Sequence, residues 1–278
     1  MRQTTLPSGE SIPVLGQGTW HLGEHRERRS QEIETLQLGI DMGMTLIDTA
    51  EMYGDGAAEQ LVADAVADRR EQVFIVTKVL PRNATDKKRL VAACERSLRR
   101  LRVDCIDLYL LHWRDKEDLA EVVGTFGELA DAGKIRHWGV SNFDVMDLQQ
   151  LERIPGGEAV ATDQVLYNIS RRGIEYDLLP RCRNRGLTVM AYSPIEQGRI
   201  LGNSAVQRIA TRHHATPAQI ALAWVVRQDG VVAIPRSSST AHVRENCGAV
   251  GITLSRRDLE EIDSAFPPPK EPQSLEMI

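Results

Sequence analysis

Short apolar runs recur along the whole chain at near-regular intervals, and this repeat constrains the fold more than any other feature. Their ends are mostly separated by roughly 25 to 35 residues, the length of one strand followed by one helix. The runs are rich in Val, Ile and Leu without strict polar alternation, which is typical of strands buried on both faces of a parallel sheet. The eight runs are Val14–Gly18, Thr45–Asp48, Val73–Lys78, Asp107–His112, His137–Asn142, Ala161–Gln164, Thr188–Ser193 and Val231–Ser237.

The segments between the runs have the periodicity of helices. Apolar residues fall on one helical face in Leu90–Leu101, in Leu119–Leu129 and in Ile33–Ile40, which Gly43 follows as a C-cap. Eight strands that alternate with helices predict an α/β fold, a closed (β/α)8 TIM barrel. The alternative is an open doubly wound sheet, but Gly16-Gln17-Gly18 lacks the third glycine of its G-x-G-x-x-G loop.

Two segments lie outside this repeat. Thr4–Pro13 contains Pro7-Ser8-Gly9 and predicts a β-hairpin that caps the barrel floor. Leu254–Phe266 predicts an extra C-terminal helix, which Pro267–Pro269 ends. No stretch has the composition of an interdomain linker, so we expect residues 1–278 to form a single domain.

Composition excludes several classes of protein. Hydrophobic residues make up 42% and charged residues 26% of the chain, as in ordinary globular proteins. The four cysteines are scattered, which argues against a metal site or a disulfide framework and fits a reducing compartment. The net charge of −5 argues against nucleic acid as a partner. We find no signal peptide and no apolar run of about 18 residues, so we expect a cytoplasmic monomer without a membrane partner.

The carboxyl ends of the predicted strands carry a distinctive set of polar side chains. Barrel enzymes build their sites from these ends, and neighbouring strands bring them together. Asp48, Lys78 and His112 end three successive strands, and Tyr53 follows Asp48 in the next loop. The other strand ends are Asn142, Gln164, Ser193 and Ser237.

Each member of this set also has a plain structural interpretation. Lys78 alone could be a surface lysine after a frayed strand, but a buried lysine needs a paired charge, which Asp48 supplies. Tyrosine has an ordinary pKa of about 10, which a neighbouring ammonium can lower by roughly 1–3 units. His112 alone could be a core histidine, whereas beside Trp113 at a strand end it could donate a hydrogen bond to a substrate oxygen.

Several motifs together resemble those of the aldo-keto reductase family, in order along nearly the whole chain. Gly39–Asp55 (GIDMGMTLIDTAEMYGD) is similar to the first family signature, and Cys105–Trp113 (CIDLYLLHW) to the segment that carries the family's histidine. Ile234–Asn246 (IPRSSSTAHVREN) resembles the C-terminal cofactor motif. Shorter matches are Gly18-Thr19-Trp20, Gly139–Asn142 and Ala191–Ile195.

The resemblance implies an NADP-dependent oxidoreductase that reduces aldehydes and ketones to alcohols. The family's catalytic tetrad falls on Asp48, Tyr53, Lys78 and His112 without departure. A hydride then passes from C4 of the nicotinamide to the carbonyl carbon, and Tyr53 protonates the oxygen. His112 orients the carbonyl, Lys78 lowers the pKa of Tyr53, and Asp48 pairs with Lys78.

The same resemblance implies the contacts of NADPH/NADP+. Ser141, Asn142 and Gln164 hold the nicotinamide amide, and Tyr192 stacks on the ring. Ser193, Pro194 and Ile195 run beside the pyrophosphate. Arg236, Ser237, Ser238, Ser239, His242, Glu245 and Asn246 meet the adenosine end. The remaining expected contacts are Gly18, Thr19, Trp20, Asp48, Gln197 and Ile234.

One position departs from the family pattern. Many NADP-preferring members have Arg where this chain has His242, which can stack on the adenine but carries less fixed charge near pH 7. Arg236 stands where Lys or Arg is common, and its fork suits a phosphate. We therefore expect NADPH to be preferred over NADH by a reduced margin.

The expected substrate is a small carbonyl compound, with Trp20, Met52, Tyr53, His112 and Trp113 as its contacts. Thr49–Gly56, Arg172–Pro180 and Ala191–Arg199 resemble bacterial methylglyoxal-type reductases, which favours methylglyoxal or similar small aldehydes. Two other functions stay open: an NADPH-binding redox sensor or regulatory subunit on the same fold, and a barrel hydrolase. A hydrolase would need paired acids at strand ends, and only Asp48 stands at one.

Overall fold

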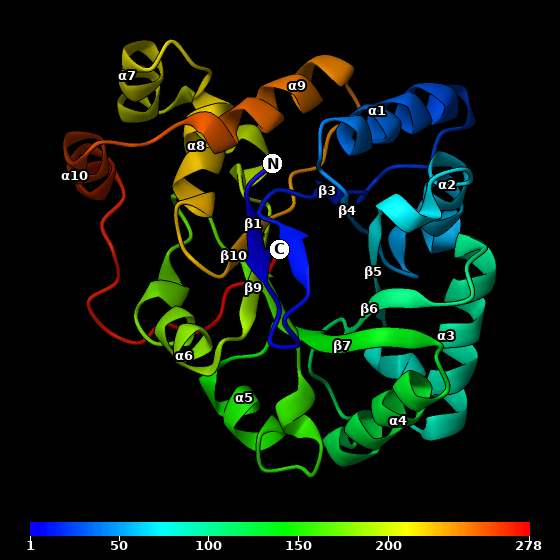
Figure 1. The fold of residues 1–278 in the computed structure, drawn as a ribbon. Coiled ribbons are helices and arrows are strands. Elements are labelled where there is room, and N and C mark those ends of the chain that lie inside the picture. The colour runs from blue at the N-terminus through cyan, green and yellow to red at the C-terminus, as the bar shows by residue number, and fades with distance from the viewer.

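The computed structural model describes all residues from Met1 to Ile278. Eight parallel strands pair in chain order and form one curved sheet with helices around it (Figure 1). This confirms the predicted (β/α)8 barrel. The strands are β3 (Gln17–Gly18), β4 (Leu46–Asp48), β5 (Phe74–Val79), β6 (Ile106–Leu111), β7 (Ile135–Ser141), β8 (Thr162–Leu166), β9 (Thr188–Tyr192) and β10 (Val231–Ala233).

The first and last strands close the ring. Backbone N–H groups of Gly16 and Gly18 donate to the carbonyls of Ala233 (2.8 Å) and Pro235 (3.0 Å), and Ala233 donates to Val14 (2.9 Å). The strand β10 ends earlier than the predicted run Val231–Ser237. Pro235 has no N–H to donate, so the regular ladder cannot continue through it.

Ten helices surround the strands. Polar side chains fix several of their starts: Asp86 accepts a hydrogen bond from the Arg89 N–H, and Ser255 forms a capping box with Asp258. No helix is both long and apolar enough to cross a bilayer. The helices are α1 (Arg29–Asp41), α2 (Ala57–Ala65), α3 (Lys87–Leu101), α4 (Leu119–Asp131), α5 (Val145–Leu151), α6 (Leu178–Arg185), α7 (Ser204–Arg212), α8 (Pro217–Val226), α9 (Thr240–Gly248) and α10 (Arg256–Ala265).

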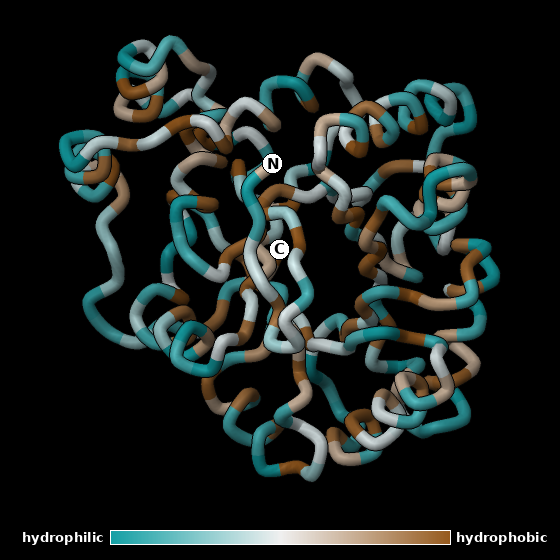
Figure 2. Tube along the Cα trace, viewed as in Figure 1, coloured by the Kyte–Doolittle hydropathy of each residue, from teal (hydrophilic) through white to brown (hydrophobic).

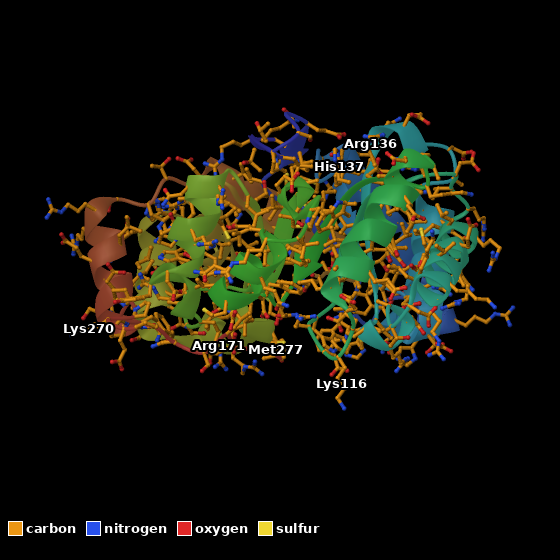
Figure 3. All side chains as sticks on the ribbon, turned by 90° about the horizontal axis from the view of Figure 1, so that it is seen from below. Lys116, Arg136, His137, Arg171, Lys270 and Met277 are labelled. Atoms are coloured by element: carbon orange, nitrogen blue, oxygen red, sulfur yellow. The ribbon has the colours of Figure 1, made fainter.

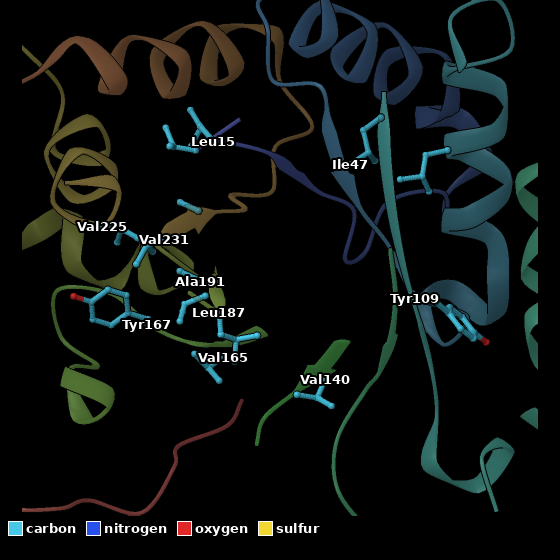
Figure 4. Packing of buried hydrophobic residues seen from close by; sticks show 14 of the residues in the cluster. Leu15, Ile47, Tyr109, Val140, Val165, Tyr167, Leu187, Ala191, Val225 and Val231 are labelled. Atoms are coloured by element: carbon cyan, nitrogen blue, oxygen red, sulfur yellow. The ribbon is translucent and has the colours of Figure 1, made fainter. Parts of the chain in front are cut away.

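Two hydrophobic clusters lie on the two faces of the strands. The larger one, of 60 residues, fills the space between strands and helices; Figure 4 shows part of it, including Ile47 and Tyr109. The smaller one, of 11 residues, lies inside the barrel and contains Leu46 and Leu108. Along the helices apolar and polar residues alternate, as expected where one face packs on the strands and the other faces solvent (Figure 2).

The predicted hairpin is present at the barrel floor. Strands β1 (Gln3–Thr5) and β2 (Ser11–Pro13) pair antiparallel. Leu6 and Ile12 from this hairpin belong to the inner cluster, so apolar side chains plug this end of the barrel. The hairpin does not cover the other end of the barrel, where the parallel strands have their carboxyl ends, so a functional site can form there.

Candidate active site

The alternation of side chains along a strand places three predicted catalytic residues inside the barrel. On β4, Leu46 points inward and so does Asp48, two residues on. On β5 the inward residues Phe74 and Val76 are followed by Lys78. On β6 the inward residues are Leu108 and Leu110, and the same alternation makes His112, the residue after the strand, point inward too. Each polar group therefore continues an inward apolar row at the open end of the barrel.

The ammonium of Lys78 is fully buried and has three oxygen partners. Its Nζ donates to Asp48 Oδ2 and to the Thr49 carbonyl, both at 2.8 Å, and lies 3.4 Å from the Tyr53 hydroxyl. The side chain of Lys78 is 0% exposed and that of Asp48 is 3% exposed. Because an unpaired buried charge is unfavourable, Asp48 is what allows the lysine to stay charged there.

Tyr53 reaches this pair from the loop that follows β4, at the start of the short 3-10 helix η2 (Tyr53–Gly56). Its ring lies 5.9 Å from the His112 ring in an edge-on orientation. The tyrosine hydroxyl and the imidazole thus lie together at the open end of the barrel, and the lysine lies directly behind the hydroxyl.

Burial raises the pKa of the Tyr53 phenol well above its usual range, and the negative charge of Asp48 adds to this effect. This differs from the sequence-based expectation that Lys78 lowers the pKa of Tyr53. The physical reason is that Asp48 neutralises Lys78, while the buried site disfavours phenolate. Tyr53 is therefore a neutral phenol with a proton to give.

Burial also determines the state of the other two titrating groups. It lowers the pKa of His112 well below its usual range, and the positive charge of Lys78 acts in the same direction, so His112 is a neutral imidazole. Burial lowers the pKa of Lys78 as well, although the charge of Asp48 opposes the shift. The Nδ1 atom of His112 is buried and has no hydrogen-bond partner.

A polar chain of side chains continues from Asp48 across the barrel. Gln164 donates through Nε2 to Asp48 Oδ1 at 2.7 Å, and the Ser141 hydroxyl donates to the backbone carbonyl of Gln164 at 2.8 Å. Asn142 donates to Ser141 Oγ at 3.1 Å and accepts from the Tyr192 hydroxyl at 2.9 Å. Asn142 is the residue after β7 and has a left-handed backbone conformation with φ 57°.

A single cavity of ≈ 880 Å³ opens over these residues. Most of the side chains predicted to contact cofactor or substrate line it. They are Gly18, Thr19, Trp20, Asp48, Met52, Tyr53, His112, Trp113, Ser141, Asn142, Gln164, Tyr192, Ser193, Pro194, Ile195, Gln197, Ile234 and Arg236. Lys78 is not part of this wall but lies behind it, in contact with Tyr53 and Asp48.

Comparison with known proteins agrees with this geometry. The sequence matches the Aldo/keto reductase family over residues 14–266. The chain belongs to this family. It is 48% identical over 273 residues to the methylglyoxal reductase YeaE of Escherichia coli strain K12, covering 96% of each chain. It is also 33% identical to the glyoxal reductase of Bacillus subtilis strain 168, covering 93% of this chain and 91% of the relative.

A solved structure extends the likeness to the whole fold. An aldo/keto reductase from Klebsiella pneumoniae, crystallised with NADP and acetate, superposes with a TM-score of 0.97 over 100% of both chains at 45% identity. Such close agreement over the full length means that strands and loops of the two reductases correspond throughout.

Six predicted cofactor contacts of this aldo/keto reductase lie outside the cavity, at the entrance to α9 and on that helix. In the turn before α9, the Ser237 hydroxyl donates to the Ser239 carbonyl and accepts from the Ser239 N–H. Arg236, at the cavity edge, forms no ion pair. A helix start beside an unpaired arginine is favourable for phosphate. The six residues are Ser237, Ser238, Ser239, His242, Glu245 and Asn246.

Four residues that line the cavity were not predicted: His21, Gly198, Met277 and Ile278. His21 and Gly198 adjoin predicted contacts, so the neighbouring motifs could have indicated them. Met277 and Ile278 come from the tail that runs from α10 back to the middle of the barrel (Figure 1). No local pattern in the tail signals this return.

Proposed function

We propose that this chain reduces aldehydes and ketones to alcohols with NADPH, and that Tyr53 supplies the proton. The observation that carries this proposal is the neutral Tyr53 phenol held 3.4 Å from the Lys78 ammonium on the cavity wall, edge-on to neutral His112. A phenol beside a buried lysine and an imidazole is suited to giving a proton to a carbonyl oxygen.

The cavity has the chemistry required to hold the cofactor. Amide and hydroxyl groups of Ser141, Asn142 and Gln164 suit a carboxamide, and the Tyr192 ring on the same wall suits a flat heterocycle. Ser193–Ile195 and Gln197 line the next part of the cavity, and unpaired Arg236 suits a phosphate. When bound there, NADPH supplies a hydride from C4 of its nicotinamide.

The residues of the chain then act on the substrate oxygen. His112, held neutral, orients the carbonyl by hydrogen bonding. The Tyr53 hydroxyl gives its proton to the oxygen as the carbonyl carbon accepts the hydride, which leaves a phenolate on Tyr53. The Lys78 ammonium stabilises that phenolate, and Asp48 keeps Lys78 in place. In this role Lys78 acts on the product of proton transfer, because burial and Asp48 keep Tyr53 protonated before it.

Methylglyoxal or another small aldehyde is the substrate that we propose. Support comes from the names of two relatives, a methylglyoxal reductase and a glyoxal reductase. Trp20 and Met52 are 41% and 42% exposed at the mouth and offer apolar surface without charge. We further propose that residues 1–278 act as one domain, as a monomer, in the cytoplasm, and that NADPH is preferred over NADH.

The test is reduction of a panel of aldehydes and ketones, followed by NADPH absorbance, with Tyr53→Phe as the matched variant. We expect Tyr53→Phe to lower kcat by about 10²-fold or more, since it removes the proton donor but keeps the ring. Its affinity for NADPH, measured by quenching of tryptophan fluorescence, should stay within about twofold of the parent. Retained turnover in Tyr53→Phe would mean that the proton comes from another group.

A further inference from the structure

One arginine outside the cavity joins two separate segments of its wall. Arg171 lies in the loop after β8 and donates through Nε to Glu196 Oε1 at 3.1 Å. Through Nη1 it also donates to Glu276 Oε1 at 2.6 Å. Glu196 belongs to the loop after β9, and Glu276 to the C-terminal tail. Figure 3 shows Arg171 and Met277 close together at the open end, whereas Arg136 and His137 lie at the hairpin end.

The loop after β9 has a bent backbone that needs support. Ser193, Glu196 and Gln197 all have left-handed φ values, of 47°, 49° and 54°. Such values are unfavourable for residues other than glycine and persist only where surrounding contacts hold them. Ser193 and Gln197 line the cavity, while Glu196 does not.

The carboxylate of Glu196 is the group that holds this bend. It is 5% exposed and accepts from Asn168 Nδ2 (2.7 Å), Arg171 Nε (3.1 Å) and Arg199 Nη2 (2.9 Å). Asn168 also donates to the Ser193 carbonyl at 2.9 Å. Because charge-assisted hydrogen bonds in a buried setting are the stronger kind, the loss of one donor should loosen the loop.

The tail depends on the other side of the same guanidinium. Glu276 directly precedes Met277 and Ile278, which line the cavity near the apolar mouth. The pair of Arg171 and Glu276 is 36% and 44% exposed, so water screens it. An exposed pair of this kind contributes less than the pair with Glu196.

We propose that Arg171 is a positioning residue that sets both walls of the cavity, the cofactor side through Glu196 and the substrate side through Glu276. The proposal rests on the proposed function, because it takes the loop after β9 as the cofactor wall. Its central consequence is that the two effects of Arg171 can be separated by changing one partner at a time.

The test uses three variants and two kinds of measurement. We expect Arg171→Ala to raise the Kd for NADPH about tenfold, through Glu196, and the KM for aldehyde about two- to threefold, through Glu276. Glu276→Gln should raise the KM alone and leave the Kd for NADPH within about twofold. The comparison variant is Arg199→Ala, which removes a donor to Glu196 and one to Gln197 but no contact with the tail, so it should raise the Kd alone.

Two results would overturn the proposal. One is an Arg171→Ala variant with an unchanged Kd for NADPH. The other is a double variant, Arg171→Ala with Glu276→Gln, whose KM rises by the product of the single effects, because a shared contact can be lost only once. Arg171→Lys keeps the positive charge but loses the planar, forked guanidinium, so this variant should keep at most one of the two contacts.

Amide hydrogen exchange keeps the test independent of turnover. Arg171→Ala should speed exchange in both residues 193–198 and residues 274–278, whereas Glu276→Gln should speed it only in the tail. If no aldehyde is reduced at all, the proposed function fails while exchange still decides the positioning role. Unchanged exchange in both segments of Arg171→Ala would contradict that role.

Discussion

Replacing Asp48 with Asn tests how the buried lysine is stabilised. The variant keeps the size of the side chain but removes the only negative charge that pairs with Lys78. Lys78 must then either remain charged without a partner or release its proton. The ordinary pKa of a lysine is 10.5, so neutralising it at pH 7 costs about 5 kcal/mol, at about 1.4 kcal/mol per pH unit. This value is an upper bound, and it agrees with about 3–5 kcal/mol for breaking a buried pair.

The pH dependence of this loss has a definite sign. In Asp48→Asn the folded-state pKa of Lys78 falls further below its unfolded value, so the unfolded state binds more protons between the two values. Stability of the variant therefore rises with pH in that range. The difference from the parent should shrink by up to about 1.4 kcal/mol per pH unit between pH 7 and pH 9.

Urea unfolding at pH 7, 8 and 9 measures this difference directly. The matched control is Asp41→Asn, since Asp41 pairs with Arg69 on the surface and its side chain is 63% exposed. That change should cost under about 1 kcal/mol at every pH. A difference of less than about 1 kcal/mol for Asp48→Asn, or one that does not vary with pH, would refute the reasoning.

Three further predictions concern the cavity and the residues around it. Because burial and Lys78 hold the pKa of His112 well below its usual range, kcat/KM should show no ionisation near pH 6.5; a break there that disappears in His112→Gln would contradict this. His242→Arg should raise the ratio of kcat/KM for NADPH to that for NADH by about fivefold, because a guanidinium binds phosphate through two parallel N–H donors, and an unchanged ratio would place residue 242 away from the phosphate. Glu51 accepts from the Leu80 N–H and from Asn83 Nδ2, both at 2.8 Å, and so ties the loop before Tyr53 to the end of β5. Glu51→Ala should lower kcat about tenfold with little effect on NADPH binding, while Glu51→Gln, which keeps the acceptor, should lower it less; equal losses in both would point to charge instead.

The barrel and most of the cavity wall could be predicted from the sequence, because the position of a strand and the alternation of its side chains between two faces are local properties. Asp48 and Lys78 end apolar runs, and a parallel barrel brings such ends together whatever the details of packing. The pKa of Tyr53 could not be predicted in the same way. Its direction depends on how deeply the phenol is buried and on how completely Asp48 neutralises Lys78, and both are properties of the packed structure.

The tail shows a second limit of sequence-based prediction. Pro267–Pro269 correctly indicated the end of α10, but the return of Met277 to the cavity depends on long-range contacts such as the pair of Arg171 and Glu276. The helix α3 was predicted from its apolar face and not from its N-cap. Its apolar face begins at Leu90, while the helix itself begins at Lys87, where Asp86 caps it.

The seam that closes the ring also determines when the protein can finish folding. One edge of β3 pairs with β4, which follows soon along the chain. At the other edge, the N–H groups of Gly16 and Gly18 donate hydrogen bonds to Ala233 and Pro235, near the end of the chain. During synthesis the first barrel strand therefore keeps an unpaired edge until nearly the whole chain has emerged. Exposed strand edges are templates for pairing with other chains. A chain cut short before β10 should thus expose two open sheet edges and aggregate, although it still contains most of the helices and strands.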